Sequence, residues 1–204
     1  MRFCIRWSAI MEGKYYLQDP SDPLSKHVHI CFQLSSGRQL RYHDTRKFGR
    51  MSILPKDTDL AAFHGLGPEP FDSAFSPEYI HAYRRERSEP IKSLLLDQSF
   101  VAGIGNIYAD EILFACGIRP GRSCTRLTRE NDADLVRETR RILTAAIAAG
   151  GTTIRTYTSS LGVSGLFQLE CMVHEQKQCR ICGSAIKVKW IGGRSSYYCP
   201  ECQK

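Results

Sequence analysis

The chain has 204 residues, 42% of them hydrophobic, with a formal net charge of +7 and a pI near 9.0. This length suffices for one sizeable core, or for two small domains with a metal-held appendage. The positive charge indicates a polyanionic partner that is bound in a salt-dependent way. Apolar runs are too short to cross a bilayer and the N-terminus lacks a secretory signal pattern, so neither a membrane protein nor a secreted one is expected.

Residues 1–54 have the pattern of strands. Polar and apolar residues alternate in HVHICFQL (27–34), and SSGR then reads as a turn into QLRYHD, with RMSIL as a later strand. The segment DPSDP between Leu17 and Leu24 predicts a loop. Residues 55–90 are rich in proline and glycine, as in LGPEPFDSAFSPEY, and lead into a charged helix around Tyr79–Arg87. That change of composition marks a domain boundary.

From Ile91 the pattern becomes helical. IKSLLLDQ predicts a first helix, and a second begins at Asn106 after a glycine turn. Thr128 is the expected N-cap of a third helix, which the pair Gly150–Gly151 ends. Apolar residues recur along this third helix at helical spacing: Leu135, Ile142, Leu143 and Ile147.

The C-terminal segment carries two cysteine pairs, Cys179-x2-Cys182 and Cys199-x2-Cys202, sixteen residues apart. Each pair forms a tight knuckle, and two knuckles supply the four tetrahedral thiolates of a closed structural Zn²⁺ site, one ion per chain. Basic side chains lie on or beside the intervening hairpin: Arg180, Lys187, Lys189 and Arg194. Such a ribbon suits a nucleic-acid backbone. A protein-binding adaptor is the alternative, against which Arg194 at the turn argues.

Five further cysteines are outside these pairs: Cys4, Cys31, Cys116, Cys124 and Cys171. Their number is odd and their spacing does not match a disulfide framework. Reduced thiols in a cytosol-like compartment are therefore predicted.

The string GIGNIY (103–108) permits two interpretations. Two glycines allow a sharp turn, after which the free amides of a helix starting at Asn106 could bind phosphate. The plainer interpretation is an ordinary helix–turn–helix joint with Asn106 as a cap. A dinucleotide-binding fingerprint is excluded, because the third glycine is missing and a helix, not a strand, precedes the string.

Several separated strings, in order, resemble the formamidopyrimidine-DNA glycosylase family, relatives of endonuclease VIII. They are MEGKYYL, LRYHDTRKFGRM, LLLDQSFVAGIGNIYADEILFACGIRP, GGTTIRTY and GGRSSYYCPECQK. The resemblance runs from about Met11 to Lys204 and implies an α+β fold. Its expected parts are a partial antiparallel β-sandwich over 1–54 (the second half of the family's catalytic domain), a connector over 55–90, a helix–two-turn–helix DNA-binding domain over 91–170 and a zinc-ribbon finger over 171–204.

The resemblance also implies an activity. Members are base-excision repair DNA glycosylases and apurinic-site (AP) lyases that act on 8-oxoguanine and formamidopyrimidines in damaged double-stranded DNA. A monomer in the bacterial cytoplasm, associated with the nucleoid, is expected. Asn106 and Arg194 match the pair that holds the phosphates flanking the lesion, and pinching those phosphates kinks the duplex and eases base extrusion.

Three residues match the trio that fills the space left by the extruded base. Phe48 wedges the base step, Met11 occupies the hole, and Arg46 binds the orphaned partner base. The alternative is that Met11 and Phe48 belong to a core. Arg155 matches a basic position near the lesion phosphate. The stretch 156–167 matches a loop that covers the extruded purine, and the alternative is a plain surface loop with the same sequence pattern. Lys92 and Arg119 read as phosphate neighbours or solvated charges.

The family's chemistry uses an N-terminal proline as nucleophile and an adjacent glutamate as acid/base. This sequence begins MRFCIRWSAI and has no such pair, so the catalytic residues are expected outside it. The abrupt agreement from Met11 predicts a broken or mis-started reading frame. The alternative function is a catalytically inactive remnant that still binds damaged DNA. We expect no efficient borohydride trapping of the 204-residue chain on an abasic duplex.

Overall fold

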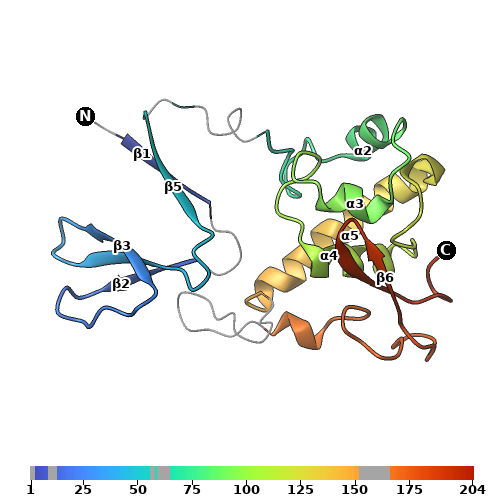
Figure 1. The fold of residues 1–204 in the computed structure, drawn as a ribbon. Helices are drawn as coiled ribbons and strands as arrows, with labels where there is room; N and C mark the ends of the chain where they lie inside the picture. The colour runs from blue at the N-terminus through green and yellow to red at the C-terminus, as the bar shows by residue number, and fades with distance from the viewer. Residues whose placement is uncertain (1–2, 9–12, 56–57, 59–64, 152–165) are drawn as a thin grey trace. The chain divides into compact units, whose positions relative to one another are not determined.

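The computed structural model describes residues 3–8, 13–55, 58, 65–151 and 166–204. The chain divides into two compact units (Figure 1). The first unit consists of Met1–Leu60 with Thr153–Gly165, and its described elements are all strands. The second unit consists of Ala61–Thr152 with Leu166–Lys204 and combines helices with a β-hairpin. The α+β class expected from the sequence is therefore confirmed.

The first unit contains two antiparallel sheets, as a partial sandwich requires. One pairs β1 (Phe3–Ser8) with β5 (Arg50–Pro55), and the other has the order β2 (Lys14–Gln18), β4 (Gln39–His43), β3 (Val28–Gln33). The sheets face each other, because the Tyr15 hydroxyl of β2 donates to Met51 Sδ of β5 at 3.7 Å. Side chains of β3 and β5 line a cavity of about 290 Å³ between them.

The loop that the sequence predicts between Leu17 and Leu24 is held by a buried arginine. Arg41 of β4 donates from Nη2 to Asp19 O and from Nη1 to Asp22 O, each at 3.0 Å. Elsewhere the described residues of this unit bury little apolar surface. Among its described residues Tyr42 is the one hydrophobic side chain that is fully buried, whereas Ile53 is 72% exposed. Among the described residues, hydrophobic burial therefore contributes less stability here than in the second unit.

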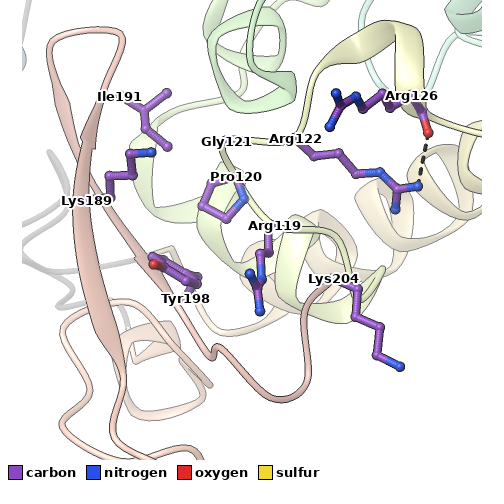
Figure 2. Close-up of a pocket in the computed structure, with 9 residues that line it drawn as sticks. All are labelled: Arg119, Pro120, Gly121, Arg122, Arg126, Lys189, Ile191, Tyr198 and Lys204. Carbon is purple, nitrogen blue, oxygen red and sulfur yellow. Dashed lines mark hydrogen bonds between the residues drawn. The ribbon is translucent and has the colours of Figure 1, made fainter.

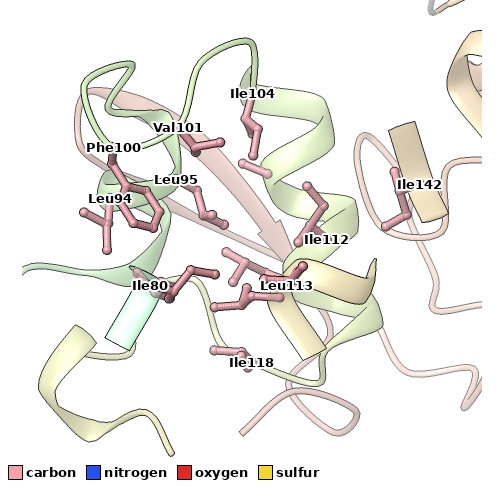
Figure 3. Close-up of a cluster of buried hydrophobic side chains, with 14 of the residues drawn as sticks. Ile80, Leu94, Leu95, Phe100, Val101, Ile104, Ile112, Leu113, Ile118 and Ile142 are labelled. Carbon is pink, nitrogen blue, oxygen red and sulfur yellow. The ribbon is translucent and has the colours of Figure 1, made fainter. Parts of the chain in front are cut away.

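The second unit surrounds one hydrophobic core (Figure 3). Its helices are α2 (Pro77–Arg84), α3 (Ile91–Leu96), α4 (Asn106–Ala115) and α5 (Arg129–Ala148), with short 3-10 turns η1 (Cys124–Arg126) and η2 (Phe167–Leu169). Leu94, Phe100 and Leu113 are completely buried in that core. None of the helices that the structure describes is long and apolar enough to cross a membrane.

Capping residues set the helix ends. Ser76 accepts a hydrogen bond from Tyr79 N, and Pro77 occupies the first position of α2, so this helix begins and ends earlier than the predicted Tyr79–Arg87. Thr128 caps α5 as expected, in a reciprocal pair with Asn131. At the other end of α5, Gly150 and Gly151 both adopt positive φ.

One of the apolar residues that recur along α5 does not face the core. Ile147 is 69% exposed, whereas Ile142 and Ala146 are buried. Position 146 lies only about 40° around the helix from 142, while 147 lies about 140° away, at roughly 100° per residue. The apolar face of α5 therefore ends at Ala146.

The C-terminal hairpin pairs β6 (Lys187–Ile191) with β7 (Arg194–Tyr198). Gly192 and Gly193 form its two-residue turn with φ of +56° and +73°, a conformation in which the missing β-carbon removes strain. A β-carbon on Gly192 would lie 2.9 Å from Ser93 Oγ, so the turn rests directly on α3. Arg194 follows this turn.

Candidate metal centre and nucleic-acid interface

The four cysteines of the C-terminal pairs converge. The sulfur atoms of Cys179, Cys182, Cys199 and Cys202 all lie within 4.8 Å of one another. Sγ–Sγ distances are 3.7 Å between Cys179 and Cys202 and 3.4 Å between Cys182 and Cys199. Tetrahedral zinc with bonds of about 2.3 Å needs sulfurs about 3.8 Å apart. The donor set and its spacing therefore fit one structural Zn²⁺.

The thiols of this cluster titrate unevenly. Hydrogen bonds from Ser184 lower the pKa of Cys182 to about 6, whereas the pKa of Cys202 is raised, chiefly by its contact with Cys182. Four thiolates confined to this space repel one another, and a bound divalent cation compensates their charge.

The start of α4 is not capped by a side chain. Gly105 is the N-cap residue, and Asn106 is the first residue of the helix itself, so the interpretation of Asn106 as a cap is wrong. The backbone amides of Asn106 and Ile107 have no hydrogen-bond partner among the described residues. Uncapped amides at the positive end of a ten-residue helix can bind an anion.

The side chain of Asn106 ties this helix start to the hairpin. Asn106 Nδ2 donates to Ser195 O at 3.1 Å, and Lys92 Nζ donates to the same carbonyl at 2.8 Å. Arg194 directly precedes Ser195. It is exposed and makes no side-chain hydrogen bond or ion pair within the described part of the chain. The structure therefore brings the predicted Asn106 and Arg194 to one place. Asn106 Oδ1 is buried without a partner among these residues.

Beneath that contact lies a buried charged network. Lys92 and Asp110 are both completely buried, with Lys92 Nζ 2.7 Å from Asp110 Oδ1. Asp110 Oδ2 also lies 2.7 Å from His174 Nδ1 and accepts from Tyr197 N at 3.3 Å. Burial lowers the pKa of Lys92, and Asp110 opposes that shift. Lys92 is therefore neither a phosphate neighbour nor a solvated charge: it supports the hairpin from inside.

Two further charged residues fasten the C-terminal segment to the helices. Glu111 accepts from the backbone amides of residues 172–174 at 2.8–3.0 Å. Arg119 donates to Gln203 O at 2.8 Å and to Pro200 O at 2.7 Å, so its guanidinium is committed to the ribbon and is not simply solvated. For Asp110 and Glu111 the sequence signal was their position as an acidic pair inside the otherwise apolar IYADEILF.

In the first unit, Asp44 shapes the loop between β4 and β5. Its carboxylate accepts from the amides of Arg46, Lys47 and Gly49 at 2.8–3.0 Å, and from the Tyr42 hydroxyl at 2.9 Å. Burial opposes ionisation of Asp44, yet these bonds, led by Gly49 N, lower its pKa below the usual value. Gly49 is required here, because a β-carbon would lie 1.8 Å from the Tyr42 hydroxyl.

This loop presents the predicted intercalating residue. Phe48 is 53% exposed, so the core interpretation of Phe48 is wrong and the loop-tip interpretation agrees with its position. Arg46 lies on the same loop. Met11, Arg155 and most of the stretch 156–167 lie outside the described residues.

The start of α4 follows a glycine turn and is bonded through Asn106 to a hairpin that carries four converging cysteines. This combination is that of a helix–two-turn–helix protein with a zinc ribbon. Family comparison agrees: residues 66–158 match the formamidopyrimidine-DNA glycosylase H2TH domain, and residues 5–51 match the formamidopyrimidine-DNA glycosylase N-terminal domain. The second match begins before Met11, where the quoted motifs start.

Known proteins give the same result. The chain is 43% identical to a formamidopyrimidine-DNA glycosylase of Oceanobacillus iheyensis over 198 residues, which is 95% of this chain and 70% of that protein. A crystal structure of a Lactococcus lactis Fpg mutant with Fapy-dG DNA matches with a TM-score of 0.90 at 35% identity, over 99% of this chain and 75% of that one. MutM (Fpg) of Thermus thermophilus matches with a TM-score of 0.87 at 33% identity, over 98% and 76%. The chain belongs to the formamidopyrimidine-DNA glycosylase family.

Proposed function

We propose that this chain serves a DNA glycosylase and AP lyase activity that removes oxidised purines from double-stranded DNA, and that its described residues grip the DNA. The lesions are 8-oxoguanine and formamidopyrimidines, and the setting is base-excision repair at the bacterial nucleoid. Support comes from the family and from relatives crystallised with DNA that contains Fapy-dG or an abasic site. The observation that carries the proposal is the hydrogen bond from Asn106 Nδ2 to Ser195 O.

That bond fixes two cationic elements side by side. The uncapped start of α4 offers amides and the positive end of the helix dipole, and Arg194 offers a guanidinium fork that suits phosphate. Held together, the start of α4 at Asn106 and the side chain of Arg194 form a clamp that grips neighbouring backbone phosphates on the lesion-containing strand. Drawing two phosphates toward one point bends the duplex, and a bent duplex extrudes a base at lower cost.

Residues of the first unit then fill the gap. Phe48, exposed on the loop that Asp44 organises, wedges between base pairs. Arg46 binds the base left without a partner, and Met11 occupies the vacated space. Unstacking one base step costs a few kcal/mol, part of which an inserted aromatic side chain recovers. Arg155 binds the phosphate near the lesion.

Removing either half of the clamp should weaken binding to an abasic-analogue duplex. We expect Arg194→Ala to lose about 1–3 kcal/mol of binding free energy, the range for a hydrogen bond to a charged group. Asn106→Ala should lose a similar amount, because it removes the bond to Ser195 O that holds Arg194 beside α4. Fluorescence anisotropy at one fixed salt concentration measures the affinity. Arg137→Ala, which removes an exposed arginine on α5, is the matched control and should bind as the unchanged protein does. Equal affinities for all four proteins would rule out the clamp.

The glycosylase and lyase chemistry is tested on protein purified from the cells that produce it, and not on the 204-residue chain alone, for which no efficient adduct is expected. Borohydride reduces the Schiff base between an enzyme amine and the opened sugar, leaving a covalent adduct. We expect an adduct with an 8-oxoguanine duplex and none with the matched guanine duplex. Tight binding of the damaged duplex without any adduct would refute the lyase activity and leave damaged-DNA binding alone.

A further inference from the structure

A second basic site lies on the flank of the ribbon. The turn after α4, which includes Pro120 and Gly121, faces strands β6 and β7 across a pocket of about 450 Å³. Figure 2 shows Lys189 and Ile191 extending from the hairpin toward that turn. A β-carbon built on Gly121 would lie 3.6 Å from Ile191 Cδ1 and 4.0 Å from Lys189 Nζ, so the glycine leaves this space open.

The pocket is strongly cationic. None of the described residues that line it is acidic, and its basic residues are Arg119, Arg122, Arg126, Lys189 and Lys204. Arg119 is occupied by ribbon carbonyls, and Arg122 Nη2 donates to Arg126 O at 3.0 Å. The side chains of Arg126 and Lys189 are exposed and make no hydrogen bond or ion pair with other described residues. Like charges held together in this way are costly unless an anion joins them.

The pocket's remaining surface is apolar. Ile191 is buried at its wall and Tyr198 contributes a half-buried ring. An anion with an apolar body matches this combination, and guanidinium and ammonium groups together suit phosphate. A phosphate carried on a sugar has both properties.

The pocket adjoins the proposed clamp. Ile191 pairs with Arg194 across the hairpin, and directly paired residues point to the same face of a two-stranded sheet. Lys189 lies two residues before Ile191 in β6 and shares that face. We infer that the pocket binds a further phosphate of the DNA backbone, outside the step that Asn106 and Arg194 hold. This inference rests on the proposed function, because it takes DNA as the source of the phosphate.

The test compares the salt dependence of binding on two duplexes that carry the same abasic analogue. One duplex is a single helical turn, which spans the clamp, and the other is three turns long. The double variant Arg126→Gln with Lys189→Gln removes two of the pocket's uncommitted cations. On the long duplex we expect its log–log salt slope to fall by about 0.9, the contribution of the one phosphate contact that is lost. On the short duplex its slope and affinity should equal those of the unchanged protein.

A charge-matched control separates pocket binding from net charge. Arg85→Gln with Arg137→Gln removes two exposed arginines outside the pocket, and it should leave both slopes unchanged. Equal slope changes in the two double variants would overturn the inference and leave only general electrostatic attraction. A second outcome would also overturn the inference: the unchanged protein binds inorganic pyrophosphate in calorimetry, the pocket variant does not, and yet both bind the long duplex with the same salt slope. If the unchanged protein bound neither duplex, the proposed function itself would fail.

Discussion

Removal of the metal is expected to abolish most of the DNA affinity. Chelation, or Cys199→Ser, deprives the hairpin of a tetrahedral site of the kind that contributes about 10–16 kcal/mol to folding of isolated zinc modules. Cys199 and Cys179 also pack with Phe114 and Val173 in a small buried cluster, so the ribbon should loosen from α4. Without a fixed hairpin, Arg194 is no longer held beside the start of α4. The expected loss is roughly 3 kcal/mol or more, above that of Arg194→Ala alone.

Three measurements check this result together. Metal content should fall from one zinc per chain to none, anisotropy should report the lost affinity, and far-ultraviolet circular dichroism should retain most of the helical signal. The helices keep their own core, to which the four metal-binding cysteines do not belong. Cys31→Ser, at an exposed cysteine of β3, is the matched control and should change none of the three readings. Unchanged affinity after complete zinc removal would contradict the role given to Arg194.

The second large effect concerns stability. Asp110→Ala leaves Lys92 buried without its counter-ion and removes the acceptor of His174 and of Tyr197 N. Breaking one side of a buried ion pair typically lowers the free energy of unfolding by about 3–5 kcal/mol. We expect that loss in urea denaturation of the second unit. Because Lys92 also donates to Ser195 O, DNA affinity should fall in parallel.

Two comparison variants sharpen this prediction. Asp134→Ala removes a surface carboxylate of α5 that pairs with the exposed Arg137, and it should change stability by less than about 1 kcal/mol. Removing both buried charges, with Asp110→Leu and Lys92→Met, should restore part of the stability, because no unpaired charge is then buried. If Asp110→Ala and Asp134→Ala were equally mild, the buried network would have no structural importance.

Local signals in the sequence were sufficient for many elements. Thr128 before an amphipathic run, Gly150–Gly151 after it and the two cysteine pairs each act over a few residues, and each appears in the structure as predicted. Ser76–Pro77 is the same kind of signal, although the predicted helix start missed it. Strand pairing was not predictable in this way: β1 pairs with β5 and β4 lies between β2 and β3, choices that depend on contacts distant in sequence.

The sequence alone determined the four-cysteine cluster, the helical domain and the family, because cysteine knuckles, caps and glycine turns are short-range chemistry. Only the tertiary structure decided what the charged residues do. Lys92 and Arg119 look like ordinary surface cations in the sequence, yet one is buried against Asp110 and the other holds ribbon carbonyls. Arg126 and Lys189 look no different, yet they line one pocket. A charge has a role only through its neighbours, and in this chain the neighbours are tens of residues away.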